Sequence, residues 1–391
     1  MKITVDRKLL VLVSAGLVVF AVSGALMGRV VALEGTYGYL KLFNEALYLI
    51  VNNYVQPVQI DGLMEGAYRG MLESLDPANE YLPARIYEKA ARGETAGPAE
   101  VGAILSKRRS YISVVSALPG SPAAEAGLKG GDLIITIAGK STRLMGLWEA
   151  GQALRGRVGS KVELTVATAD APRRRPLSLV RRILAAPGPV AQFEAPDTGV
   201  VRIGGLREGD ARRVDQAIAS LKRRGVTRLL LDLRGCSSDA LAEAIGVVSL
   251  FMRQGPVVSV TDRYDGDKVF RADGRRIAWE RLPVVALVDE GTSEACEVMT
   301  AALRDGLGFP VVGERTWGHG VVRRLLPLQH GDGVILATGR FESPAGKEWN
   351  GKGLEPDLTI EGDPSGAGDP QRRQAVDYLR GVTVPPPARA A

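Results

Sequence analysis

The chain has 391 residues, of which 45% are hydrophobic and 24% charged, so it can bury substantial cores and fits two or three domains. Its net charge of +6 comes from arginines scattered over predicted strand flanks and helix faces, with only 5% aromatic residues and no groove-reading motif. This pattern argues against a nucleic-acid partner. The two histidines and two cysteines offer no metal-ligand spacing, and we predict neither a metal nor a cofactor.

The amino-terminal segment predicts a membrane anchor. Residues 9–28 carry no charge over twenty positions, and Lys8 and Arg29 flank them. Such a helix can span a bilayer with its basic end on the cytoplasmic side. We therefore expect a single pass through the cell inner membrane within residues 1–30, with the bulk of the chain facing the periplasm. A cleaved signal peptide is the alternative, because Ser23, Gly24 and Ala25 are small enough for a cleavage site.

Residues 31–97 form a predicted helical region. Leu42, Ala46 and Leu49 recur at helical spacing in a helix over 37–54, and a second helix follows over 62–75. The region holds no cluster of titratable residues. We expect it to serve packing or self-association, so that copies of the chain could form a homo-oligomer through these helices.

Residues 98–184 form a predicted small β-domain of about the minimum size that folds alone. Its elements are a strand at 112–115, a capped turn at 121–128, a strand at 133–137, a helix carrying Trp148 and Leu154, and a strand at 161–166.

This order of elements, together with the segment GSPAAEAGLKGGD at 120–132, resembles a PDZ domain. The resemblance implies that a peptide adds as a strand to an exposed sheet edge, with its terminal carboxylate held by backbone amides. Glu100 stands where a glycine is usual in the loop entering the first strand. The positions expected to bind peptide are Val101, Gly102, Ala103, Ile104 and Trp148.

Residues 185–361 alternate strands and helices, which predicts βα units around a mostly parallel sheet. The expected elements are strands at 199–203, 228–233 and 257–260 and helices at 210–224 and 241–253. The tail over 362–391 is rich in Gly, Pro and Ala, and contains a short predicted helix at 371–379.

The segment 283–324 has the pattern of an active site. The buried strand Val284–Val288 leads into the turn at 289–291, and a helix is predicted over 295–304. A strand, a tight turn and a helix in this order present unpaired backbone N–H groups and nucleophiles to a ligand. A second turn framed by glycines, at 317–320, follows the strand Val311–Gly313.

Beyond the anchor, the chain resembles the carboxyl-terminal processing proteases, the tail-specific serine peptidases of family S41. The motifs that carry this resemblance are LDP at 75–77, YL at 81–82, the inserted PDZ-like segment, LDLRG at 231–235, DEG at 289–291 and GKGLEPD at 351–357. The resemblance implies a multi-domain α/β (α+β) fold with a ClpP/crotonase-like core and, in the family, serine endopeptidase activity with a Ser-Lys dyad.

Both dyad positions are substituted in this chain. The family motif Gly-Ser-Ala-Ser-Ala-Ser-Glu has the middle serine as nucleophile, and Glu294 occupies that position. The family places its general-base lysine 25 residues later between two glycines, where this chain has His319. The supporting glutamine of the family corresponds to Arg323. Glu294 and His319 are expected to pair as carboxylate and imidazolium, which would raise the pKa of the histidine.

The oxyanion loop also departs from the family. Where the family reads Arg-Gly-Asn-Pro-Gly-Gly, residues 234–239 read RGCSSD, and the lost glycines alter how backbone amides converge. The oxyanion positions implied by the resemblance are Gly235, Cys236 and Ala295. We hypothesise further that Cys236 and Cys296 form a disulfide across the old cleft, since an exported domain meets an oxidising environment.

The function that follows is a catalytically degenerate family member, a pseudoprotease. It would bind the carboxyl termini of polypeptides or unfolded exported proteins through the PDZ groove and the vestigial cleft. One alternative is an active peptidase in which Ser293 or Cys296 has become the nucleophile with His319 as base. Another is a structural subunit assembled through the helical region.

Overall fold

The computed structural model describes residues 37–108, 111–118, 120–143, 145–168, 171–184, 188–194, 196–360 and 369–381. The chain divides into two compact units, Met1–Tyr68 and Arg69–Ala391, which are described separately. The predicted anchor within residues 1–30 lies outside the described residues. Within the described ranges, no helix is both long and apolar enough to cross a membrane.

The first unit contains a helix over residues 37–53 and most of α2 (Ile60–Glu73). The apolar positions that predicted the first helix are exposed, with Leu42 at 62% and Leu49 at 52% of their full accessible area. α2 has no buried residue. Most apolar side chains of the first helix are therefore exposed, and those of α2 are at most half-buried.

The PDZ-like region is an antiparallel sheet with two short helices. Its strands are β2 (Ala103–Arg108), β3 (Tyr111–Ala117), β4 (Leu133–Ile137), β5 (Lys140–Ser141), β6 (Lys161–Thr168) and β7 (Ala171–Val180), and its helices are α4 (Pro122–Glu125) and α5 (Leu147–Leu154). The sheet order is β2-β3-β4-β6-β7, with β5 beside β4. Ile112 and Val114, two positions apart on β3, both point into its core, as the period-2 pattern of strands requires, and Ile134 of β4 joins them there.

A six-stranded sheet organises the remainder of the second unit. Its order is β19 (Leu358–Thr359), β16 (Val311–Gly313), β14 (Val284–Val288), β10 (Arg228–Asp232), β9 (Thr198–Arg202) and β8 (Val190–Glu194). All pairings are parallel except that of β8 with β9. The predicted strand at 284–288 is confirmed to the residue, because an unbroken apolar run is typical of a strand buried on both faces.

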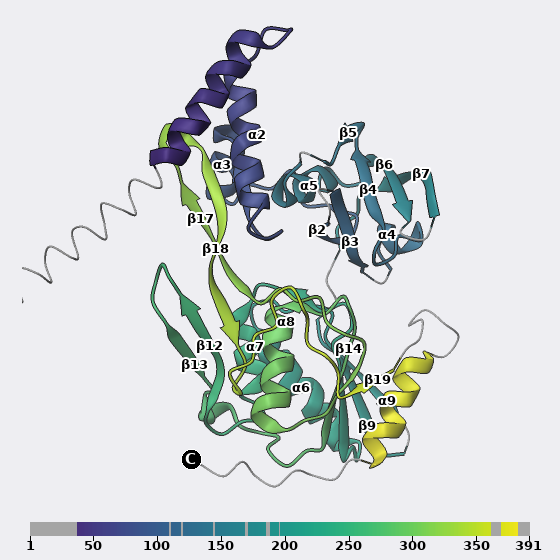
Figure 1. Ribbon diagram of the computed structural model, residues 1–391. Coiled ribbons are helices and arrows are strands. Elements are labelled where there is room, and N and C mark those ends of the chain that lie inside the picture. The colour runs from purple at the N-terminus through teal and green to yellow at the C-terminus, as the bar shows by residue number, and fades with distance from the viewer. Residues whose placement is uncertain are drawn as a thin grey trace, which may run out of the picture. The chain divides into compact units, whose positions relative to one another are not determined.

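Helices cover both faces of this sheet (Figure 1). One face packs against α6 (Asp210–Arg223), α7 (Leu241–Val248) and α8 (Ala295–Ala301), which continues into a π-helical turn (Ala302–Gly306). The other face packs against α9 (Pro370–Gly381). Alternate residues of one strand serve the two layers, since Val284 and Ala286 face the first and Val285 and Leu287 the second.

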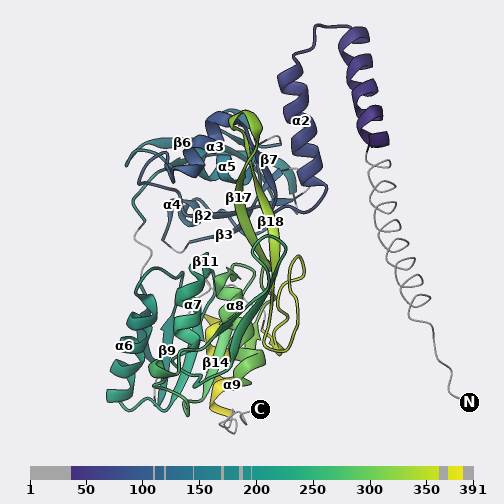
Figure 2. The same cartoon turned by 90° about the vertical axis from the view of Figure 1, so that its left-hand side faces the viewer.

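A second, antiparallel sheet was not predicted. It joins β1 (Glu80–Leu82), β18 (Gly333–Glu342), β12 (Pro256–Asp262) and β13 (Lys268–Arg271), with β17 (Val321–Pro327) also paired to β18. β17 and β18 form a long hairpin, visible in Figure 2. The expectation of a mostly parallel sheet in residues 185–361 therefore holds for the six-stranded sheet, but the same region also contributes to this antiparallel sheet. Most strand pairings of the described residues are antiparallel, and many of them are hairpins between strands that are neighbours in sequence. The fold is mixed α/β.

The remaining elements are short. They are α3 (Ala84–Ala91), the 3-10 turns Gly274–Arg276 and Gln329–Gly331, and the two-residue strands β11 (Ser237–Ser238) and β15 (Ser293–Glu294). β11 and β15 pair in parallel, and they bring the loop after β10 beside the start of α8.

Candidate functional site

Glu294 lies at a sharp elbow between β14 and α8. Its backbone has φ 58° and ψ −125°, a conformation that a residue with a side chain rarely adopts, and it is the N-cap of α8. Side chains held in this way cluster at functional sites, where the surrounding structure maintains the strain. The elbow of a nucleophile is thus present, although the side chain on it is a carboxylate.

Glu297 holds this elbow against the second glycine turn. Its buried carboxylate accepts hydrogen bonds from Thr316 Oγ1 at 2.5 Å, from the amides of Gly318 and His319 at 2.7 Å, and from the amide of Glu294 at 3.2 Å. The pKa of Glu297 is raised to about 7, because the effect of burial exceeds the opposing effect of these hydrogen bonds. Sequence reasoning did not single out Glu297. Its spacing three residues after the N-cap, as in a capping box, was the available signal.

The partner of Glu294 is Arg323. Arg323 Nη2 lies 2.5 Å from Glu294 Oε1, in an ion pair whose two side chains are half-buried. Burial raises the pKa of Glu294, and the guanidinium of Arg323 opposes this rise. The predicted pairing of Glu294 with His319 is therefore wrong. Arginine carries its charge whatever its surroundings, whereas a buried imidazole must first gain a proton.

His319 is a neutral hydrogen-bond acceptor at Nε2. The indole Nε1–H of Trp317 donates to His319 Nε2 over 3.0 Å. Burial, and then the nearby charge of Arg323, lower the pKa of His319 to about 4. The predicted rise of this pKa is therefore wrong as well. The imidazole is buried near the guanidinium of Arg323, and no carboxylate forms a salt bridge with the ring among the described residues, so its protonated form is disfavoured.

The oxyanion loop uses its amides internally. The amide of Gly235 donates to Asp289 Oδ1 over 2.8 Å, and that of Cys236 donates to the carbonyl of Leu233 over 3.0 Å. Gly235 adopts φ 66°, so glycine is needed there. Ala295, the third predicted oxyanion position, is the buried first residue of α8. Two of the three predicted donors are thus engaged with the protein itself.

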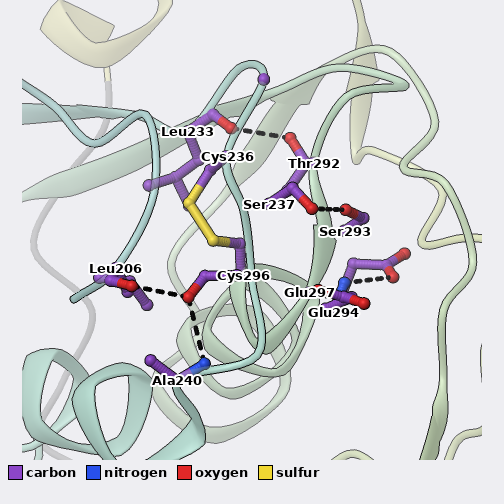
Figure 3. Close-up of a disulfide and its surroundings, with 12 residues drawn as sticks. Leu206, Leu233, Cys236, Ser237, Ala240, Thr292, Ser293, Glu294, Cys296 and Glu297 are labelled. Carbon is purple, nitrogen blue, oxygen red and sulfur yellow. Dashed lines mark hydrogen bonds between the residues drawn. A yellow bond between two sulfur atoms is a disulfide. The ribbon is translucent and has the colours of Figure 1, made fainter. Parts of the chain in front are cut away.

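Cys236 and Cys296 form a disulfide, with their Cα atoms 5.9 Å apart (Figure 3). Both residues are fully buried. The bond ties the oxyanion loop to the first turn of α8, and the hypothesised pairing is confirmed. Cys296 consequently has no free thiol in this structure.

Ser293, the other alternative nucleophile, is buried beside the disulfide. Its hydroxyl donates to Ser237 Oγ over 2.7 Å (Figure 3), and its amide donates to the carbonyl of Cys236 over 2.8 Å. These bonds follow from the pairing of β15 with β11, which sets Ser293 opposite Ser237. The hydroxyl is thus directed to another serine, and no hydrogen bond joins it to a general base within the described residues.

Two cavities meet at the substituted dyad. One, of about 450 Å³, is lined by residues of α5, β2, β1 and the oxyanion loop. The other, of about 550 Å³, is more apolar and lies over β12, β13, β17 and β18. The side chains lining both are Trp148, Glu294, His319, Arg323 and Ile335. The Glu294–Arg323 ion pair therefore lies where the two cavities adjoin.

The residues predicted to bind peptide lie together between β2 and α5. Val101, Gly102 and Ala103 line a cavity of about 180 Å³, and Ile104 and Trp148 line the 450 Å³ cavity. Val101 is only 1% exposed and belongs mainly to the core.

Glu100, at the entrance of this groove, is held by two arginines. It pairs with Arg155 at 2.8 Å, and its backbone exchanges hydrogen bonds with Arg182. The loop that would receive a terminal carboxylate thus already contains a carboxylate.

Glu80 connects β1 to the groove. Its Oε2 accepts a hydrogen bond from the amide of Trp148 over 3.0 Å, in the first turn of α5. Burial raises the pKa of Glu80. No sequence pattern indicated this contact, because it joins residues of different regions.

A three-layer α/β core with a strained strand-to-helix elbow, combined with a small antiparallel β-domain that has a groove between β2 and α5, is an arrangement in which serine peptidases present their nucleophile. Family models agree with this class: "Peptidase family S41" matches residues 197–360, "PDZ domain" matches 113–168, and "Activating protease CtpB N-terminal domain" matches 23–85.

Whole-chain comparisons define the family. The chain is 30% identical over 344 residues to the carboxy-terminal processing protease CtpA of Bacillus subtilis, covering 87% of this chain and 72% of the relative. It is 29% identical over 359 residues to the carboxy-terminal-processing protease of Bartonella bacilliformis, covering 90% and 81%. The chain belongs to the carboxyl-terminal processing proteases of peptidase family S41.

A solved structure supports the same fold. The photosystem II D1 C-terminal processing protease superposes with a TM-score of 0.70 at 27% sequence identity, covering 83% of this chain and 89% of that one.

Proposed function

We propose that this chain is a pseudoprotease of the S41 family, which binds exported polypeptides through its PDZ groove and vestigial cleft without cleaving them. The observation that carries the proposal is the Glu294–Arg323 ion pair on the preserved elbow. A carboxylate cannot act as the acylating nucleophile of a serine peptidase, and here it is neutralised by a neighbouring guanidinium.

The rest of the catalytic apparatus supports the same conclusion. His319 at the base position is neutral, and its Nε2 is occupied by the indole of Trp317. The amides of Gly235 and Cys236 donate to protein acceptors, so they are not directed at an oxyanion. Loss of one oxyanion donor alone costs about 10²–10³ in kcat in serine peptidases.

Polypeptide binding is supported by the parts of the cleft that remain. β2 is an edge strand of the PDZ sheet within the described residues, so it can accept a further strand. The adjoining cavities of about 450 and 550 Å³ are lined by apolar side chains together with charged side chains of both signs, so they offer contacts to both the apolar and the polar groups of a polypeptide. We propose carboxyl termini or unfolded segments as ligands, with the chain acting as an adaptor or as a competitor of an active relative.

The location we propose is the periplasmic face of the inner membrane, with residues 9–28 as the anchor. The Cys236–Cys296 disulfide supports an oxidising compartment. The exposed apolar side chains of the helix over 37–53 support self-association through the helical region.

The test measures labelling, cleavage and binding on the same full-length protein. We expect no labelling by a fluorophosphonate, no degradation of β-casein as an unfolded substrate, and measurable binding of fluorescein-labelled β-casein. Specific labelling that disappears in Ser293→Ala, together with casein cleavage, would show an active serine peptidase instead. Absence of both cleavage and binding would favour a structural subunit.

Matched variants locate the binding surface. Ile104→Asp places a charge on the edge strand β2 and is expected to weaken casein binding. Val180→Asp places the same charge on β7, the opposite edge of the same sheet, where Val180 is 42% exposed. The second variant should bind as the wild type does. Equal loss in both variants would contradict binding along β2.

A further inference from the structure

His319 has a hydrogen-bond donor with no acceptor. Trp317 donates to Nε2, and a nitrogen that accepts a hydrogen bond carries no proton. In the neutral ring the proton must therefore be on Nδ1. This atom is buried and has no hydrogen-bond partner among the described residues.

The surroundings fix both the ring and its tautomer. Glu297 holds the amides of Gly318 and His319, so the backbone on either side of the ring is anchored. Burial and Arg323 keep the ring neutral by lowering its pKa to about 4. When one partner sets the tautomer of a neutral imidazole, the protonation of the other nitrogen is fixed as well. Here Nδ1 is fixed as a hydrogen-bond donor.

The charges around the ring indicate which acceptor would suit it. His319 lines both cavities together with Arg323 and Glu294, and Asp239 is near enough to raise the pKa of Glu294. The charge of Arg323 is balanced by its ion pair with Glu294, and the other charged side chains that line the two cavities are of both signs, so the ring does not face an unbalanced cation that would select an anion. An uncharged oxygen is favoured, and the main-chain carbonyl is the uncharged acceptor that every polypeptide offers.

We propose that the Nδ1–H of His319 donates a hydrogen bond to a main-chain carbonyl of the polypeptide bound in the cleft. This inference rests on the proposed function, because it names the group of the ligand that the vestigial site recognises. The free protein leaves this donor unsatisfied, so a bound carbonyl recovers a hydrogen bond that solvent does not provide. Because Nδ1 is buried in the free protein, the proposal requires a neighbouring side chain to move when the segment binds, and Arg323, which lines the same cavities and is 33% exposed, is our candidate.

Three substitutions of His319 separate the donor from the bulk of the ring. The amide nitrogen of an asparagine falls near the position of Nδ1, whereas that of a glutamine falls near Nε2. We expect His319→Asn to bind fluorescein-labelled β-casein within about twofold of the wild type. His319→Gln and His319→Phe should bind about fivefold to tenfold more weakly, the effect of one neutral hydrogen bond.

The tautomer can be observed directly, since the chain has only two histidines. A His330→Gln variant labelled with ¹⁵N-histidine leaves His319 as the single imidazole. Its nitrogen shifts should report a protonated Nδ1 and an unprotonated Nε2, and added β-casein should move the Nδ1 resonance. Trp317→Phe removes the indole donor and should yield a mixture of tautomers, with weaker casein binding. This measurement does not depend on whether the His319 variants fold.

The source of the oxygen is tested with a synthetic peptide of the last twelve residues of β-casein. The loss of affinity caused by His319→Gln should be the same whether the carboxyl terminus of the peptide is free or amidated. A loss confined to the free acid would identify a terminal carboxylate and overturn the proposal.

The remaining outcomes separate the two proposals. If the wild type and His319→Gln bind casein equally strongly, or if the spectrum shows a protonated Nε2, the role of His319 is overturned and the proposed function still stands. Absence of casein binding by the wild type would overturn the proposed function, and this inference with it.

Discussion

Glu294 has its strain in the backbone rather than in the side chain. A glycine adopts φ 58° and ψ −125° without strain, whereas any residue with a Cβ is strained there by about 1–2 kcal/mol. Glu294→Ala and Glu294→Gly both remove the ion pair with Arg323, so their difference isolates the backbone. We expect the glycine variant to be the more stable by about 1–2 kcal/mol in urea unfolding.

The neighbouring Ala295 provides the control. It is the first residue of α8, and Ala295→Gly should lower the free energy of unfolding by up to about 1 kcal/mol. Glycine in place of alanine should therefore raise the free energy of unfolding at position 294 and lower it at position 295. A Glu294→Gly variant less stable than Glu294→Ala would contradict the strained elbow.

His319 makes a predictable contribution to the pH dependence of stability. Its pKa in the folded protein is about 4, below the ordinary value of 6.5, so the unfolded chain binds the proton first as the pH falls. The stability that His319 contributes is present above pH 6.5 and is lost as the pH falls toward 4. Relative to His319→Asn, the wild type should lose about 2 kcal/mol between pH 7 and pH 5.

Chemical unfolding at several pH values measures this difference. The contribution of Glu297 to the pH dependence cancels in the comparison, because both proteins contain this residue. His330→Asn, at the exposed second histidine, is the matched substitution control. A parallel profile for the wild type and His319→Asn would show that the imidazole is not held neutral.

At the level of elements, the disulfide joins a loop to a helix over a sequence separation of 60 residues. Closing a loop of this size removes conformational entropy from the unfolded chain. The double variant Cys236→Ala/Cys296→Ala should therefore be less stable by about 4 kcal/mol in urea unfolding. Alanine is chosen because both sites are fully buried and a serine hydroxyl would lack a partner.

The matched single variants should be destabilised to a similar extent, because either one opens the loop. Treatment of the unfolded wild type with a reductant before refolding provides an independent comparison. A double variant within about 1 kcal/mol of the wild type would mean that residual structure in the unfolded chain offsets the entropic effect.

The contact between β1 and α5 depends on a glycine. A Cβ added at Gly146 would lie 1.7 Å from Glu80 Oε1, whereas one at Gly151 would meet nothing within 4 Å. We expect Gly146→Ala to break the hydrogen bond between Glu80 and the amide of Trp148, and so to speed hydrogen exchange of that amide. Gly151→Ala, inside the helix that Gly146 caps, should slow exchange by stabilising α5 by up to about 1 kcal/mol. Unchanged exchange in Gly146→Ala would contradict the contact.

The predictability of the elements from sequence depended on how fully they are buried. β14 is an unbroken apolar run, and its limits were predicted correctly. β17 and β18 were missed because most of their residues are only half-buried, which leaves neither an apolar run nor clean alternation. Their pairing is a property of tertiary packing rather than of local pattern.

For the whole molecule, the family resemblance predicted which positions form the site but not how their side chains pair. Glu294 was located by the family motif and His319 by the family's offset of 25 residues, and both border the same cavities. Arg323 was identified only as a changed supporting residue, although it is the ion-pair partner of Glu294. Side-chain direction depends on the strained elbow and on the capture of the 316–319 turn by Glu297, and neither is visible in a one-dimensional pattern.

The site is assembled from separate segments, and this predicts what restoring activity would require. Glu294→Ser, His319→Lys and Arg323→Gln together supply the family dyad and its support on the preserved elbow. We nevertheless expect this triple variant to leave β-casein uncleaved, because the amides of Gly235 and Cys236 still donate to Asp289 and Leu233. A missing oxyanion donor costs about 10²–10³ in kcat.

Cleavage should appear only when the oxyanion loop is restored as well. The disulfide must be removed for this, since it ties Cys236 to α8. The added changes are Cys236→Asn, Ser237→Pro, Ser238→Gly, Asp239→Gly and Cys296→Ser, which give the loop and helix start their family sequence. We expect fluorophosphonate labelling and casein cleavage in this eight-position variant, both abolished when position 294 is changed to alanine instead of serine. The loop changes made alone, with Glu294 in place, are the matched control and should remain inactive. Cleavage by the triple variant would show that the amides can turn toward a substrate while the disulfide is intact, and that the side chains at 294, 319 and 323 alone account for the loss.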